Sequence, residues 1–166
     1  MKRIGLPPLA LSLLLVCAPS IAFDASVPPQ GLPSASTYSS TLLPDRAGVV
    51  SWKTLAKVEP ISDHGRIVSK FDPSITELDR TTVRVQGFML PMDLGDMQHH
   101  FVISAVPPHC PFCLPAGPDA LMEVKAKKGV AYSLEPVLLS GKFIVVKDDS
   151  YGLLYQLVDA EVVREQ

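Results

Sequence analysis

Two cysteines three positions apart form the most distinctive chemical feature of the sequence. Cys110 and Cys113 enclose Pro-Phe and belong to a twelve-residue segment, 107 to 118, that contains five prolines. Because proline restricts the backbone, such a segment is a stiff loop that loses little entropy when its side chains are fixed. The residues therefore predict a preformed site on a loop between two strands.

A metal site is the first chemistry that this pair can serve. Two thiolates this close can hold one soft or borderline cation, and tetrahedral zinc requires two further ligands. His109 precedes the first cysteine, and His99 and His100 begin the strand that leads into the loop. Neighbouring side chains of a strand point to opposite faces, so we expect only one of these two histidines to face the site. The pattern predicts a Zn²⁺ site.

The turn before that strand offers further ligand atoms. Asp93 and Asp96 could add carboxylate oxygens. Met89, Met92 and Met97 lie in the same region, and their thioether sulfurs together with thiolates would favour Cu(I). Methionines at such positions are more often core residues, so zinc is the preferred interpretation.

Two other chemistries leave the metal out. A disulfide between Cys110 and Cys113 would close a tight loop, which suits an oxidising compartment. A dithiol oxidoreductase would use the tetrapeptide as glutaredoxins do, with a helix starting at the motif and lowering the pKa of the first thiol. Pro115, Gly117 and Pro118 follow at once and oppose such a helix. Since no other catalytic arrangement is recognisable either, we expect a protein that is not an enzyme.

The start of the chain indicates export. Lys2 and Arg3 precede an uncharged apolar stretch, 4 to 16, and residues 20 to 22 place small side chains where a signal peptidase reads them. An apolar stretch of this length, interrupted by two prolines, is too short to span a membrane. We therefore expect a signal peptide over 1–22, cleavage after Ala22 and a periplasmic protein.

Cleavage would also change the composition. The full chain of 166 residues carries a net charge of −2 and three cysteines. Without its first 22 residues it loses two basic side chains and Cys17, which leaves 144 residues, a net charge of −4 and one cysteine pair. Cys17 also allows a lipoprotein interpretation, ranked second because the large Val16 precedes it. The near-balanced charge argues against binding nucleic acid through a basic surface.

The remaining chain divides into a leader and one domain. Residues 23 to 47 contain four prolines, five serines and three charged residues without helical or strand periodicity, which predicts a flexible leader. The globular domain is expected over 48–166. Its length is that of a single domain.

The pattern within the domain predicts strands with two short helices. Ser51 can cap a helix over 52–58, and Asp72-Pro73 can start a second short helix ending at Leu78. Alternating apolar and polar residues predict strands. This is an all-β domain, a small OB-like barrel in which Gly87 and Gly141 permit sharp bending in mid-strand; a two-sheet sandwich is the alternative. The expected strands are 65–71, 83–90, 100–106, 121–126, 137–146 and 153–163.

Several segments carry a family resemblance. Gly-Phe-Met-Leu-Pro at 87–91 and the Cys-Pro-Phe-Cys loop are its strongest parts, and it extends over about residues 49 to 163. The chain resembles an uncharacterised bacterial family of exported OB-like proteins, a domain of unknown function. Some members are encoded beside MacB-like ABC transporters and have been linked to zinc handling in the periplasm. The resemblance implies a periplasmic zinc-binding protein, such as a metal chaperone or transporter accessory, without supplying a ligand set.

We therefore expect a monomeric periplasmic protein that binds Zn²⁺, with candidate ligands Cys110, Cys113, His109, His99 and His100. The expected partner is an ABC transporter or another periplasmic metal-binding protein. Neither nucleic acid nor a stable membrane span after cleavage is expected. The alternative is a non-metal interaction module in which the cysteine pair forms a structural disulfide.

Overall fold

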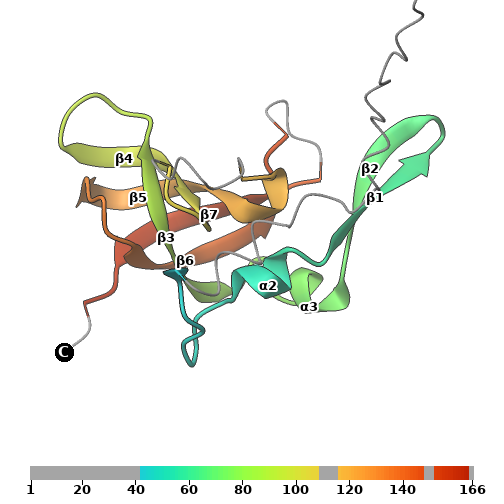
Figure 1. Cartoon of the computed structure of the whole chain (residues 1–166), viewed down its shortest axis with the longest axis horizontal. Helices are drawn as coiled ribbons and strands as arrows, with labels where there is room; N and C mark the ends of the chain where they lie inside the picture. Colours follow the sequence, from blue (N-terminus) through green and yellow to red (C-terminus); the bar gives the residue numbers. More distant parts are fainter. Residues whose placement is uncertain (1–41, 109–115, 148–151, 165–166) are drawn as a thin grey trace, which may run out of the picture. The chain divides into compact units, whose positions relative to one another are not determined.

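A computed structural model (Figure 1) describes residues 42–108, 116–147 and 152–164. The expected signal peptide, 1–22, lies outside these ranges. Strands dominate, and the helices are single turns; no helix in the described ranges has the length and apolar character needed to cross a bilayer. In chain order the elements are α2 (Trp52–Leu55), β1 (Val58–Asp63), β2 (Arg66–Phe71), α3 (Pro73–Thr76), β3 (Thr82–Pro91), β4 (Met97–Ser104), the 3₁₀ helix η1 (Pro118–Ala120), β5 (Leu121–Ala131), β6 (Val137–Val145) and β7 (Tyr155–Val162).

Five strands close into a barrel. Their order is β3-β4-β5-β7-β6, and β6 pairs with β3 to complete the circle. Every pair is antiparallel except β5 with β7, which is parallel. This order with one parallel pair is that of an OB-type barrel, so the predicted fold class is confirmed and the sandwich alternative is wrong. β1 and β2 form a separate two-stranded sheet.

The barrel interior is filled by alternate residues of its strands. In β5, β6 and β7 most inward side chains are buried while many of their neighbours reach solvent, whereas β3 buries five consecutive residues, 85–89. Where burial alternates, the period of two in the sequence marks the strand, and the predicted strands overlap all five strands of the barrel. The largest buried side chains are Tyr155, Phe101, Phe143, Leu55, Ile75 and Met89.

Helix α2 is fastened to the barrel by two buried hydrogen bonds. The indole Nε1 of Trp52 donates to the carbonyl oxygen of Gln86 at 2.8 Å, and the hydroxyl of Tyr155 donates to the carbonyl oxygen of Leu55 at 2.6 Å. Ser51 caps the helix as predicted, with its side chain accepting from the amide of Lys53. The helix ends at Leu55 instead of residue 58, because the chain turns directly into β1.

Strand β1 was not predicted from the sequence. It pairs with β2 through the two-residue turn His64-Gly65, in which both residues have positive φ, 47° and 78°. That geometry is typical of a type I′ hairpin turn. Asp72 caps α3 with Pro73 at its first position, as expected.

The packed chain reaches upstream of the expected boundary at Gly48. Leu43 is 4% exposed and belongs to the core. The side-chain amide of Gln86 donates to the carbonyl oxygen of Pro44 at 2.9 Å, and the Asp45 carboxylate accepts from Ser51 and Lys53. The end of the segment expected as a leader is therefore attached to the barrel.

Strand β7 bends where it meets both of its neighbours. Asp159 has a φ of 54° and is skipped in the register with β5 and in the register with β6. Gly141 lies opposite this bend. A Cβ added there would lie 2.9 Å from the carbonyl oxygen of Val158 and 2.9 Å from Cγ of Leu157. The absence of a side chain at Gly141 is what allows β6 to approach β7.

Gly141→Ala should lower the free energy of unfolding by about 2 kcal/mol, because the new methyl group would press against backbone in a packed core. Urea denaturation measures the change. The matched control is Gly129→Ala, where a Cβ would meet only the side-chain ends of His99 and Met97, so the expected change is below about 0.5 kcal/mol. Equal effects at both positions would contradict the explanation.

Candidate functional site

The residues with the strongest metal signal lie outside the described part. His109, Cys110 and Cys113 fall in 109–115, between the ends of the connection that joins β4 to β5. The base of this connection is closed by a hydrogen bond from the amide of Ala105 to the carbonyl oxygen of Ala120, at 3.0 Å. Its downstream side ends in η1, a single 3₁₀ turn. The described barrel differs from a thioredoxin-like fold, in which strands and helices alternate.

His99 and His100 are described, and both reach solvent. A register shift between Gln98 and His100 interrupts the alternation of β4. Gln98 and Phe101 are buried, while His99 is exposed and His100 half-exposed between them. Because a bulge places two consecutive residues outward, both histidines reach solvent instead of alternating between the two faces of the strand.

Each histidine already has a neighbour other than a metal. Nε2 of His100 lies 2.6 Å from Oε1 of Glu123, which also lies 3.6 Å from Nζ of Lys125. The ring of His99 lies over Gly129. Within the described ranges, no three His, Cys, Asp or Glu side chains gather as metal ligands.

The two histidines lie near the start of β4, and the connection that carries the cysteine pair follows its other end. His100 is six residues before Val106, where the loop begins, and at strand spacing this is about 20 Å. Along the described part of the chain, His99 and His100 are thus separated by the length of β4 from the point where the connection to the cysteine pair begins.

Asp93 serves the turn instead of offering a free ligand. Its Oδ2 accepts from the backbone amides of His99 and His100, at 2.6 and 2.9 Å. The hydrogen bond from the His100 amide, and to a smaller extent that from the His99 amide, holds the pKa of the Asp93 carboxyl below its ordinary value. Of the three methionines near it, Met89 is a core residue, whereas Met92 and Met97 are exposed.

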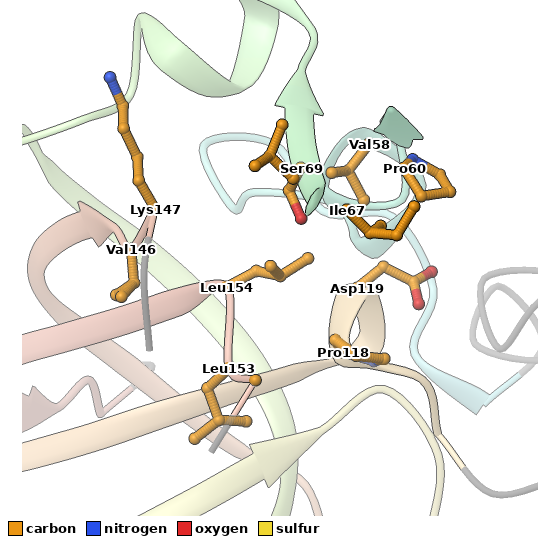
Figure 2. A pocket seen from close by; sticks show the side chains of 12 residues that line it. Val58, Pro60, Ile67, Ser69, Pro118, Asp119, Val146, Lys147, Leu153 and Leu154 are labelled. Atoms are coloured by element: carbon orange, nitrogen blue, oxygen red, sulfur yellow. The ribbon is translucent and has the colours of Figure 1, made fainter. Parts of the chain in front are cut away.

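A pocket of about 510 Å³ lies beside the base of the cysteine loop (Figure 2). One wall comes from the β1–β2 hairpin, another from η1, and a third from the connection between β6 and β7. Figure 2 shows Leu154 pointing toward the hairpin side and Asp119 standing at the η1 side. Its apolar lining residues are Val58, Pro60, Ile67, Val68, Pro118, Val146, Leu153 and Leu154.

Asp119 and Lys147 are the two ionisable residues of this lining. The Asp119 carboxylate makes no hydrogen bond or ion pair with the described residues, and its Oδ1 fills the space that a side chain at position 117 would need. It lies close enough to Tyr155 to add to the effect of burial, and both raise the pKa of that hydroxyl. A carboxylate without a described partner, beside an apolar pocket, can accept a cation or a hydrogen-bond donor.

Sequence reasoning did not find this pocket. Three of its walls come from segments far apart in the chain, and the hairpin wall includes the strand that was missed. One signal was present: Asp63-His64-Gly65-Arg66 is the kind of sequence that forms a tight hairpin turn.

Comparison with protein-family models and with curated proteins found no match. Among solved structures, the fold is similar to the crystal structure of a DUF3299 family protein from Pseudomonas aeruginosa PAO1. The TM-score is 0.50 at 16% sequence identity, and the alignment covers 71% of this chain and 97% of that chain. At this identity the likeness shows a shared fold.

Asp93→Asn should weaken the acid dependence of stability. The pKa of the Asp93 carboxyl is lower in the folded state than its ordinary value of 3.8. The carboxylate therefore stabilises the folded protein at pH values above 3.8, and this stabilisation is lost as the pH falls through the lowered pKa. Unfolding midpoints in urea, measured from pH 7 to pH 2, should show wild type and variant converging at the acid end.

The control is Glu135→Gln, which changes an exposed carboxylate on the neighbouring β5–β6 connection. It should keep the wild-type pH profile. A profile unaltered by Asp93→Asn would show that the turn does not depend on this carboxylate.

Proposed function

We propose that the protein binds Zn²⁺ through Cys110 and Cys113 at the hairpin end of the barrel, as an exported zinc-handling protein. The observation that supports this most is the position of the loop's base. The hydrogen bond between Ala105 and Ala120 closes the connection that carries the cysteine pair, directly beside the pocket, where the Asp119 carboxylate has no partner among the described residues. A closed, proline-rich loop suits a tetrahedral site, whose ligands must be held in fixed directions.

The ligands in this proposal are chosen by the metal-binding chemistry of their side chains and by their position in the chain. Two thiolates and the imidazole of His109 supply three, and Asp119 is the first described carboxylate after them in the chain. Asp119 is half-buried and makes no hydrogen bond with the described residues, so a metal would satisfy it. His99 and His100 are left out, because they lie at the other end of β4.

The resemblance extends the proposal to a partner. Some members of the family it points to are encoded beside ABC transporters, so the role that we propose for the bound metal is zinc transfer to or from a transporter complex in the periplasm. The fold shared with a DUF3299 family protein is in keeping with that resemblance.

Calorimetric titration of the reduced protein with Zn²⁺ tests the site. We expect one zinc ion per chain, and no binding in Cys110→Ser/Cys113→Ser. Asp119→Asn should weaken binding about tenfold or more, since loss of a group that supports a metal site costs at least that much. The matched control, His99→Ala/His100→Ala, removes two imidazoles at the other end of the barrel and should bind as the wild type does.

Binding that survives the double cysteine substitution would overturn the proposal. Thiol labelling and metal analysis of protein isolated from its native compartment provide the second readout. Zinc with protected free thiols supports the metal site. A complete disulfide without zinc would replace it with the interaction module that holds a structural disulfide.

A further inference from the structure

The end of the barrel away from the pocket carries an unusual number of exposed apolar side chains. We call it the turn end; it consists of the β3–β4 turn, the end of β5 with its connection to β6, and the end of β7 (Figure 1). Isolated apolar side chains on a surface need no explanation, but a gathering of them marks an interaction site. Six of the nine large hydrophobic residues exposed in the described ranges lie here: Met92, Leu94, Met97, Tyr132, Leu134 and Val162.

Leu94 is presented at the tip of a braced turn. Its side chain is fully exposed, and Gly95 beside it has a φ of 97°. The buried side chain of Gln98 donates to the carbonyl oxygens of Asp93 and Gly95 and accepts from the amide of Asp93. The amide of Tyr132 also donates to the carbonyl oxygen of Asp96, which ties the turn to the β5–β6 connection. A turn whose backbone is fixed in this way loses little entropy when its tip is bound.

A second cavity, of about 530 Å³, lies at the same end. Its apolar surface comes from β4, β5, β6 and β7, and Leu94 does not line it. Two basic side chains, Lys128 and Arg164, stand at it without an ion pair in the described part of the chain, whereas Glu161 is paired with Lys127 at 3.5 Å. The apolar lining residues are Met97, Val130, Ala131, Val137 and Val162.

The β3–β4 turn that carries Leu94 and the cavity carry opposite charge. Asp96, two residues from Leu94, makes no side-chain hydrogen bond or ion pair among the described residues. Its carboxylate matches Lys128 and Arg164 at the cavity. A protruding apolar tip and a receiving cavity on one face are what a self-complementary two-fold contact requires, because each copy offers both halves.

We propose that the turn end binds a second copy of this chain, with Leu94 of each copy inserted into the cavity of the other and Asp96 beside Lys128. This replaces the monomer expected from the sequence and is independent of zinc binding. A lipid surface fits less well. Asp93, Asp96 and Glu135 flank the apolar tips, and anionic headgroups repel carboxylates.

Light scattering during size-exclusion chromatography tests the proposal. The whole chain is expressed in bacteria, where any signal peptide can be cleaved, and the purified protein is used. We expect a dimer in the wild type that dissociates on dilution, and a monomer for Leu94→Ser. The matched control is Ile67→Ser, which alters a 75% exposed apolar residue on the β1–β2 hairpin and should stay dimeric. Circular dichroism should show unchanged folding in both, since neither side chain is buried.

Charge exchange tests the orientation. Asp96→Lys and Lys128→Glu should each weaken dimerisation about tenfold or more, and the combined variant should recover much of the loss, since the pair is restored with its signs reversed. Absence of recovery would overturn the proposed pairing.

Three other results would overturn the dimer itself. These are a wild type that stays monomeric at high micromolar concentration, a Leu94→Ser variant that remains dimeric, and a monomer that sediments with phosphatidylglycerol vesicles through Leu94. The last result would identify a lipid surface as the occupant of the turn end.

Discussion

The bend of β7 at Asp159 is the constraint on which the rest of the barrel depends. To close the circle, β7 must lie parallel to β5 on one side and antiparallel to β6 on the other, and these two pairings follow different hydrogen-bond patterns. At Asp159, which has positive φ and is skipped by both partners, the register of both pairings shifts. The absence of a side chain at Gly141 then brings β6 close enough to pair. The turns and connections at both ends of the barrel are positioned by the strands that meet at this junction.

Much of the fold could be predicted from the sequence, and the exceptions have physical causes. Most of the barrel strands bury alternate residues, so their periodicity was visible, and β3, which buries residues 85–89 in a row, begins with an alternating stretch. β1 exposes five of its six residues and contains a proline, so no such alternation existed to be read. The caps at Ser51 and Asp72 were recognisable because capping is local. The end of α2 was not, because pairing with β2 determines where the helix stops.

The candidate site shows the same division between local and distant information. The cysteine pair is a local pattern and could be identified directly. His99 and His100 lie at the start of β4, whereas the connection that carries the cysteine pair begins after its other end, and the extended strand separates these two points. Asp119 and the pocket beside it could not be found, because only the barrel topology brings the hairpin, η1 and the β6–β7 connection together. The bulge that turns both histidines outward depends on the register with β5.

The small sheet of β1 and β2 has a consequence for how this protein avoids sticking to others. A closed barrel has no free strand edge, but a two-stranded hairpin has two, and free edges recruit further strands into aggregates. Pro60 removes one amide donor from β1, and Glu59 and Lys70 place opposite charges across the pair. The hairpin thus forms a wall of the pocket while its own edges are poor templates for amyloid-like growth.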